Sequence, residues 1–377
     1  MQYLFELGKN PTLSRAEIEH VFLRDAVSYT ISTQINAYIV VETTTPLNCT
    51  VLMYELGGTI KIAQELPSSA PSPEKTLASY LNESQSGKIT FSLSGKDAKK
   101  IALATKKLLK HDGRSVRYVE IKNTATILHN NLVEKQSDCV IVDDTLFVTQ
   151  AIQPIEDLGK RDFERPGRDS KSGMLPPKLA KMMINISAAQ KDATILDPFC
   201  GSGTIATEAI LMGYSKIFAT DISEKAIDDT KKNIAWLHKE YPENTGNIEI
   251  CKKTDVAALA QHIPENSVDA IITEPYMGKP LFGNEPIEFL SGQNDYLTTL
   301  YSSAFASFKK VLKKDGIVVF IIPQFNTKNG WIYINCLDQI KKAGFTPTPL
   351  STKSESILYH RPNQHVGRRI WRFRLND

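Results

Sequence analysis

From about residue 160 onward, short apolar runs alternate with longer stretches of helical period. The runs ATILD, KIFATD, IEICK and VDAIIT read as strands, and GTIATEAILMG and SEKAIDDTKKNIAWLH read as helices between them. Such alternation is typical of a parallel sheet that helices cover on both faces. A long helix near 294–313 and the strand IVVFIIP continue the series. SILYH and RRIWRFRL flank a turn and predict an antiparallel hairpin at the sheet edge. We therefore expect an α/β domain over residues 159–377.

The first 158 residues have a different organisation. The proline- and serine-rich stretch LPSSAPSPEK predicts a linker at 66–75. Before it, the helix SRAEIEHVFLR and short β-rich runs indicate an α+β module over residues 1–66. After it, the strand KITFSLS, the helix DAKKIALATKKLLKH and three further strands, SVRYVEI, CVIVDD and TLFVTQAI, indicate a second α+β module over residues 67–158.

Positive charge is concentrated in the second module. The whole chain carries a net charge of only +3, but residues 81–135 hold 11 lysines and arginines against 5 acids. Lys99 and Lys106 form one stripe on the expected helix, Lys100 and Lys107 form a second stripe beside it, and Arg114 follows the helix. This pattern fits an RNA-binding face or an ordinary solvated helix face, and the sequence leaves both open.

Several classes of protein are disfavoured. Five cysteines without a CxxC pair argue against a disulfide framework, and seven histidines lack the spacing of metal ligands, so we expect no metal. The N-terminus lacks an apolar signal core, and IVVFIIP is too short to span a bilayer, so we expect no membrane association. A reducing cytoplasm is the expected compartment.

The segment ILDPFCGSGTIATEA joins the first strand of the α/β domain to a helix. Gly201 and Gly203 allow a tight turn and close approach to a ligand, and the N-terminus of the following helix faces the same crevice. With Ala206 they also satisfy the dinucleotide pattern GxGxx(G/A), so the glycines alone do not choose the ligand. Cys200 fits a nucleophile or a small loop residue, and no base lies nearby in sequence.

Carboxylates at strand ends narrow the choice of ligand. Asp197 ends the strand before the loop, Asp221 ends the next strand, and Asp255 follows IEICKKT. Asp221 suits ribose hydroxyls and Asp255 an adenine amine, whereas Asp197 would repel a pyrophosphate and suits a cationic amine. We therefore expect S-adenosyl-L-methionine, with helix capping as the alternative role of these acids. The candidate cofactor-binding residues are Asp197, Pro198, Phe199, Cys200, Gly201, Ser202, Gly203, Thr204, Asp221, Ile222, Asp255 and Val256.

The segment ITEPYMG ends the fourth strand of the domain. In a doubly wound sheet this strand lies beside the first, at the point where such sheets bind ligands. Glu274 then faces the cofactor from the carboxyl end of the strand. The candidate catalytic residues are Glu274, Pro275 and Tyr276.

Two motifs together carry a family resemblance. LDPFCGSGT followed by acid-Pro-aromatic at a strand end looks like the amino-methyltransferases. RPGRDSKSGMLPPKLAKMMINIS and the preceding QAIQPIEDLGKRDFERPGRD resemble the THUMP-domain tRNA guanine-N2 methyltransferases, which include the archaeal enzymes of position 10. The resemblance covers about 67–377 and is strong in 161–210 and 266–278.

The resemblance implies a fold and an activity. It implies a ferredoxin-like module at 1–66, a THUMP RNA-binding domain at 67–158 and a Rossmann-like methyltransferase at 159–377. It also implies transfer of a methyl group from S-adenosyl-L-methionine to the exocyclic N2 amine of a tRNA guanosine, with Leu175 and Pro176 shaping the methionine end of the cofactor pocket. We expect a monomer or weak oligomer.

The chain departs from the family at the catalytic motif. The family pattern is Asp-Pro-Pro-Tyr-Gly, whereas residues 274–278 read Glu-Pro-Tyr-Met-Gly. Either Glu274 or Thr273 takes the acidic position, and we favour Glu274 because a hydroxyl cannot replace the charge. Tyr276 would stack on the target base.

Other functions remain open. Arg165, Arg168 and Lys171 fit contacts with RNA phosphates or an ordinary solvated linker. An N6-adenine methyltransferase acting on RNA or DNA needs the same motif. An NAD-dependent oxidoreductase would use the same glycines, and an inactive RNA-binding protein would fit the shortened motif.

Overall fold

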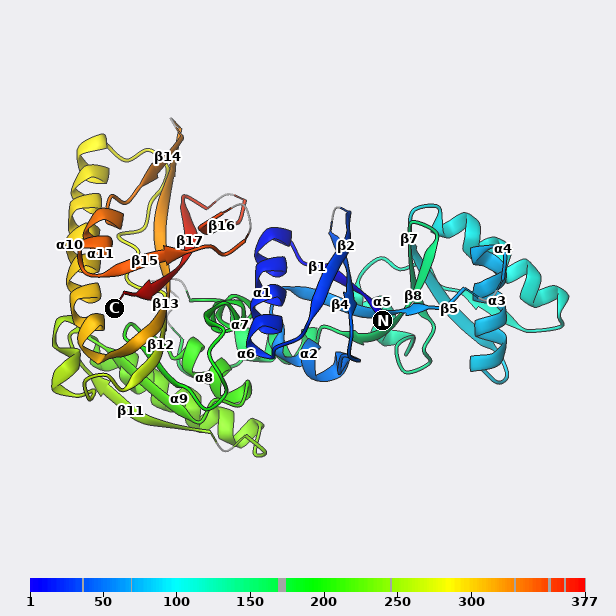
Figure 1. The fold of residues 1–377 in the computed structure, drawn as a ribbon, viewed down its shortest axis with the longest axis horizontal. Coiled ribbons are helices and arrows are strands. Elements are labelled where there is room, and N and C mark those ends of the chain that lie inside the picture. Colours follow the sequence, from blue (N-terminus) through cyan, green and yellow to red (C-terminus); the bar gives the residue numbers. More distant parts are fainter. Residues whose placement is uncertain are drawn as a thin grey trace. The chain divides into compact units, whose positions relative to one another are not determined.

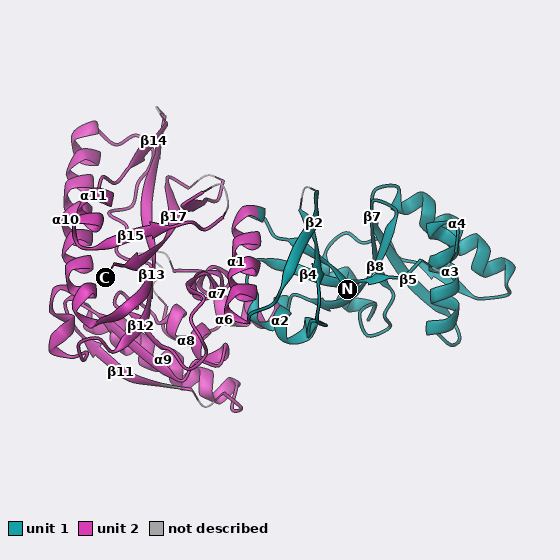
Figure 2. Cartoon of the chain, viewed as in Figure 1, with its two compact units in different colours: residues 1–11, 26–155 teal, residues 12–25, 156–377 magenta. Residues whose placement is uncertain are grey.

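The computed structural model divides into two compact units, which Figure 2 colours separately. Unit 1 comprises Met1–Pro11 and Ala26–Ile155, and unit 2 comprises Thr12–Asp25 and Glu156–Asp377. The structure describes residues 1–35, 37–68, 70–168, 174–244, 246–328, 330–351, 354–362 and 364–376. The change from unit 1 to unit 2 after residue 155 lies close to the expected start of the α/β domain at residue 159.

Unit 1 is built on an eight-stranded sheet with the order β2-β3-β1-β4-β8-β7-β5-β6 (Figure 1). Its strands are β1 (Gln2–Leu7), β2 (Tyr29–Ile35), β3 (Tyr38–Thr43), β4 (Thr59–Leu66), β5 (Ile89–Gly95), β6 (Val116–Tyr118), β7 (Asp138–Val142) and β8 (Thr145–Ile152). Its helices are α2 (Cys49–Glu55), α3 (Pro73–Ser84), α4 (Ala98–His111) and α5 (Thr124–His129). Because β4 pairs with β8, strands from both expected N-terminal modules share this sheet.

A buried polar cluster connects the middle strands of unit 1. Lys61 Nζ lies 2.7 Å from Asp138 Oδ2, and both side chains are buried. The hydroxyls of Ser92 and Thr149 each donate to the Asp138 carboxylate at 2.6 Å. Asp138 therefore holds charged and neutral partners from β4, β5 and β8, and a carboxylate buried away from water needs such hydrogen-bond partners.

Unit 2 is built on a nine-stranded sheet with the main order β11-β10-β9-β12-β13-β17-β15. Its strands are β9 (Thr194–Asp197), β10 (Lys216–Asp221), β11 (Asn247–Lys253), β12 (Val268–Thr273), β13 (Leu312–Thr327), β14 (Gly330–Tyr333), β15 (Phe345–Thr348), β16 (Ser356–Tyr359) and β17 (Val366–Leu375). The strands from β9 to β13 pair in parallel, which confirms the expected alternation.

The C-terminal hairpin forms as expected. β16 and β17 pair antiparallel. β17 pairs on one side with β13, and on its other side residues 368–371 pair with β16 while residues 372–375 pair with β15. β16 therefore lies at the edge of the sheet, which confirms the expected edge hairpin. The short segment FTPT continues the same edge as β15, a strand that the sequence did not predict.

The helices of unit 2 cover both faces of its sheet (Figure 1). They are α1 (Pro11–Arg24), α6 (Ile155–Phe163), α7 (Pro177–Ser187), α8 (Thr204–Leu211), α9 (Glu224–Glu240), the 3₁₀ helix η1 (Val256–Gln261), α10 (Ile287–Val311) and α11 (Leu337–Lys342). Ile195 and Ile272 belong to one core with α7 and α8, whereas Leu196 and Ile271 belong to another with α10. Consecutive strand residues enter opposite cores, so the sheet is buried on both sides. Every described helix is too short or too polar to cross a lipid bilayer.

Helix α1 belongs with unit 2 although most of its sequence neighbours lie in unit 1. Leu13 and Ala16 are fully buried in the core that α7 and α8 share. The amide of Asn185 on α7 donates to Glu17 Oε1 at 2.8 Å. The helix that we assigned to the 1–66 module therefore packs elsewhere, because an amphipathic pattern shows that a helix has a buried face but not which core receives it.

Candidate active site

The glycine-rich loop of unit 2 connects β9 to α8 with two residues in the left-handed region. Gly201 has φ 53° and Gly203 has φ 79°. A Cβ atom on Gly203 would lie 2.9 Å from the side chain of Thr230 on α9. Gly203 therefore needs both its backbone freedom and its missing side chain, as expected for a tight loop before a helix N-terminus.

The acids at the strand ends contact this loop. Asp197 is almost completely buried and accepts hydrogen bonds from the Thr273 hydroxyl at 2.6 Å and from Phe199 N–H at 3.2 Å. Burial raises the pKa of Asp197, the two hydrogen bonds oppose the rise, the nearby charges of Asp221 and Glu274 add to it, and together these effects place the pKa at about 7. Asp221 accepts from Gly201 N–H at 3.0 Å. The carboxyl ends of β9, β10 and β12 therefore converge on one acidic site.

Asp255 has a local role in the structure. It is exposed, and its carboxylate accepts from Ala257 N–H at 2.9 Å at the start of η1. This is the helix-capping alternative, and it leaves the second carboxylate oxygen available for a ligand. Of the apolar candidates, Val256 and Leu175 are buried, while Ile222 is 66% exposed beside Asp221.

The other candidate residues lie in or beside the loop, and Cys200 among them does not act as a nucleophile. Cys200 is buried, its sulfur accepts from the Thr230 hydroxyl at 3.6 Å, and burial raises its thiol pKa well above the ordinary value. A neutral, enclosed thiol is a poor nucleophile, so Cys200 acts as a small loop residue. The remaining loop candidates, Pro198, Ser202 and Thr204, lie with it between β9 and the first turn of α8, and Pro176 caps α7.

The segment before the loop is tied to it by two side chains, of which Asn233 was not a candidate from the sequence. Asn233 on α9 donates to Gly167 O at 2.8 Å and to Ser202 O at 2.7 Å, and accepts from Gly167 N–H at 2.7 Å. Arg165 is 3% exposed and donates to the Thr204 hydroxyl at 2.6 Å. The prediction that Arg165 meets RNA phosphates is wrong, because its guanidinium is enclosed against the cofactor loop.

The catalytic candidates follow β12 directly. Glu274 Oε1 accepts a 2.5 Å hydrogen bond from Nε of Arg368 on β17, and both side chains are about a tenth exposed, at 12% and 10%. Burial raises the pKa of Glu274, and the charge and hydrogen bond of Arg368 oppose the rise. Thr273 is fully buried, and its hydroxyl is used by Asp197. The Thr273 hydroxyl is thus already bonded, whereas the bond to Arg368 uses only one of the two carboxylate oxygens of Glu274.

Tyr276 lies at the open side of this site. It is 45% exposed, and its ring stands edge-on to Tyr296 of α10, with centroids 6.1 Å apart. The buried Tyr301 donates its hydroxyl to Tyr276 O at 2.8 Å, which fixes the backbone after Pro275. An exposed ring on a fixed backbone suits stacking against a planar base.

The RNA-binding candidates of unit 1 fall into different environments. Lys99 is exposed and lies 3.3 Å from the Glu120 carboxylate, and Lys106 is half-buried on α4. Arg114 donates to Asn82, Gln85 and Gly87, so its guanidinium ties the segment after α4 to the end of α3 and to the loop that follows it. In unit 2, Arg168 is exposed and donates to Phe163 O at 2.7 Å. Lys171 lies outside the described residues.

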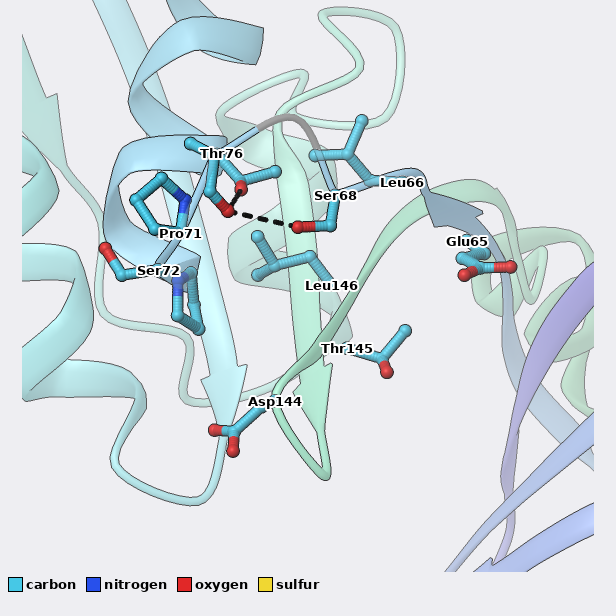
Figure 3. Close-up of a pocket in the computed structure, with 11 residues that line it drawn as sticks. Glu65, Leu66, Ser68, Pro71, Ser72, Thr76, Asp144, Thr145 and Leu146 are labelled. Atoms are coloured by element: carbon cyan, nitrogen blue, oxygen red, sulfur yellow. Dashed lines mark hydrogen bonds between the residues drawn. The ribbon is translucent and has the colours of Figure 1, made fainter.

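The described residues that line a pocket of unit 1 include no positively charged side chain. Its eleven described lining residues come from the β4–α3 connection, the start of α3 and the β7–β8 turn (Figure 3). They include the acids Glu65 and Asp144 and no lysine or arginine. A concavity lined this way does not suit a phosphate backbone, so we assign no RNA contact to it.

The fold and the converging acids are typical of an S-adenosylmethionine-dependent methyltransferase domain. A family model described as "RMKL-like, methyltransferase domain" matches residues 165–329, which include the loop, the acids and Glu274. A second model, described as a DNA methylase, matches residues 88–232. The crystal structure of TrmN from Thermus thermophilus aligns over all of both chains with a TM-score of 0.53 and 17% identity, which supports the fold.

Curated relatives specify the family. A probable tRNA (guanine(10)-N2)-dimethyltransferase from Methanothermococcus thermolithotrophicus is 30% identical over 145 residues, which are 38% of this chain and 78% of the relative. The tRNA (guanine(10)-N2)-dimethyltransferase of Pyrococcus abyssi is 32% identical over 120 residues, which are 32% of this chain and 31% of that enzyme. The chain belongs to the tRNA guanine-N2 methyltransferase family. Its matches span between 30% and 48% of the length of three curated relatives, including the Pyrococcus enzyme.

Proposed function

We propose that this chain transfers a methyl group from S-adenosyl-L-methionine to the exocyclic N2 amine of a guanosine in tRNA. One observation supports this most strongly. Glu274 follows β12 directly, and the hydroxyl of the preceding residue is bonded at 2.6 Å to Asp197 of the cofactor loop. A carboxylate is thereby held next to the loop that would present the methyl group. Position 10 is the proposed target because curated relatives are named for it.

The donor groups of the site fit the cofactor. Asp197, Asp221 and Glu274 lie close enough that each of the last two raises the pKa of Asp197. A crevice with this much negative charge favours a ligand that brings positive charge, such as an α-amino group and a sulfonium, over a pyrophosphate. Asp197 would face the amino group and Asp221 the ribose hydroxyls, while Ile222 and Val256 would flank the adenine. This charge balance also argues against the NAD-dependent alternative.

The reaction requires the protein to orient the guanine amine and to accept its proton. When bound, S-adenosyl-L-methionine supplies an electrophilic methyl group. Glu274 accepts an N–H of the guanine amine, which reduces delocalisation of its lone pair into the ring and directs it outward. Tyr276 stacks on the base, which must leave its helix to reach the site. Alignment of this kind supplies roughly 7–11 kcal/mol. Removal of the proton by Glu274 adds about 10²–10⁴-fold.

Unit 1 is the proposed tRNA-binding unit and includes the proposed THUMP domain. Lys99, Lys100 and Lys107 are exposed on α4, where lysines can reach successive phosphates of an A-form stem. All five cysteines are free, which is consistent with a reducing compartment, and we propose the cytoplasm.

Incubating the purified protein with tRNA and labelled cofactor, followed by nucleoside mass spectrometry, tests the proposal. We expect N2-methylguanosine or N2,N2-dimethylguanosine, and a loss of about 10²-fold or more in kcat for Glu274→Gln. Glu288→Gln, an exposed change in the first turn of α10, is the matched control. N6-methyladenosine would instead support the adenine methyltransferase, which the DNA methylase match favours as second candidate. The absence of any methylated nucleoside in the tRNA would refute the proposed function.

A further inference from the structure

The partner of Glu274 comes from a strand far away in sequence. Arg368 lies on β17 opposite Pro323 of β13, and β13 in turn pairs with β12, which ends just before Glu274. The two residues are 94 positions apart, and their 2.5 Å hydrogen bond depends on this strand order. The strand order thus places an arginine beside the carboxylate that is proposed to hold the target amine.

This ion pair leaves hydrogen-bonding groups unused. Only Nε of Arg368 and Oε1 of Glu274 take part in the bond between them. The two terminal Nη groups of Arg368 and Oε2 of Glu274 have no hydrogen-bond partner among the described residues, and none is sealed away from solvent. Free donors therefore stand beside a free acceptor in a site that is about nine-tenths enclosed. Polar groups in such a place are costly to leave unpaired when a ligand excludes water.

The arrangement is complementary to one edge of guanine. That edge carries the N2 amine and N1–H as donors, followed by O6 as an acceptor, and Glu274 can accept while Arg368 donates. Adenine carries an amine where guanine has O6 and has no amine at C2. The 6-amine of adenine would face the Nη donors of Arg368, and two donors cannot form a hydrogen bond with each other.

We propose that Arg368 determines specificity for guanine by donating a hydrogen bond to O6 of the base whose N2 amine Glu274 holds. The proposal rests on the proposed function and extends it from the reacting amine to the recognition of the base. Sites built to bond a polar group discriminate strongly against substrates that lack it, because their own groups are then left unpaired.

Substitution in both the enzyme and the substrate separates this role from simple support of Glu274. The substrates are two tRNAs, one with guanosine at the methylated position and one with 2-aminopurine, which keeps the 2-amine but lacks O6 and the hydrogen on N1. We expect the wild-type kcat/KM to fall about 10- to 100-fold with 2-aminopurine. In Arg368→Met, the ratio between the two substrates should fall at least tenfold because the guanosine rate alone loses the bond to O6. Arg361→Met, which removes an exposed arginine before β17, should keep the wild-type ratio.

The outcomes distinguish the two proposals. A ratio that is unchanged in Arg368→Met, with both rates lowered equally, overturns the specificity role and leaves Arg368 as a support for Glu274. Cofactor affinity and tryptophan fluorescence check that the variant folds. Should it not fold, the wild-type ratio decides, since equal rates on guanosine and 2-aminopurine overturn the proposal. A wild-type enzyme that methylates no guanosine refutes the proposed function itself.

Discussion

Replacing Asp197 by Asn should stabilise the cofactor-free protein while weakening its binding to the cofactor. The carboxyl of Asp197 is almost fully buried, and burial raises its pKa from 3.8 to about 7. The amide of asparagine is nearly the same shape and never ionises. Its oxygen can still accept from the Thr273 hydroxyl and Phe199 N–H, which both bond to Asp197 Oδ1.

The size and direction of the effect follow from the pKa. In the folded protein Asp197 keeps its proton at pH values where the unfolded chain has already lost it, so this group lowers stability progressively as the pH rises from 3.8 to about 7. At 1.36 kcal/mol per pH unit, the full difference is about 4 kcal/mol. Asp197→Asn should therefore raise the free energy of unfolding by about 4 kcal/mol above pH 7, by less at pH 5, and hardly at all near pH 4.

Urea unfolding without cofactor at pH 4 to 8 measures this effect. The three tryptophans, Trp236, Trp331 and Trp371, all lie in unit 2, so their fluorescence reports on the unit that contains Asp197. Asp228→Asn makes the same chemical change at an exposed position of α9 and is the control. A gain that is absent, or that is the same at pH 4 and pH 8, would refute the reasoning. Calorimetry should show weaker cofactor binding by Asp197→Asn.

Three further changes test other parts of the structure. Gly203→Ala should destabilise unit 2 by about 1–3 kcal/mol in urea, and by more than Gly213→Ala, which has the same left-handed backbone but nothing within 4 Å of its Cβ. Lys100→Glu with Lys107→Glu should weaken tRNA binding about tenfold in a filter assay while leaving cofactor affinity unchanged, and unchanged tRNA affinity would leave α4 a solvated face. Asp138→Ala leaves a buried lysine without its 2.7 Å carboxylate partner, so it should cost unit 1 about 3–5 kcal/mol, measured by hydrogen exchange of its amides, and a loss under 1 kcal/mol would contradict the assigned role.

The sequence predicted the parts of the site that depend on local order. Asp197, Asp221 and Glu274 were identified because each follows a strand, and the carboxyl ends of parallel strands meet at one edge of a sheet. β9 to β12, α8 and α9 were predictable for a related reason, since each carries its own periodicity and stop signals. η1 was not predicted, and α10 and β13 begin earlier in the chain than expected. Alternation therefore predicted both the covered sheet and the location of the site.

Arg368 and Asn233 were beyond the reach of the same reasoning. In RRIWRFRL, Arg368 and Arg369 point to opposite faces, and only the position of β17 inside the sheet shows which of them meets Glu274. Asn233 looks like part of a solvated helix face, whereas it is fully buried against the cofactor loop. Long-range pairing decides both cases, and a single sequence does not encode it in any local pattern.

Helix α1 has a consequence for the order in which the protein is made. It is synthesised before α7, and its hydrogen-bond partner on α7 follows 168 residues later. At ordinary rates of translation the helix waits roughly 10–30 s for that partner. During this time Leu13 and Ala16 lack their native cover, while the chain on either side, up to Pro11 and from Ala26, can already close unit 1. Unit 2 must then bind α1, which is inserted in the sequence of unit 1. A truncated protein that begins after unit 1 would leave the place of α1 in the core unfilled.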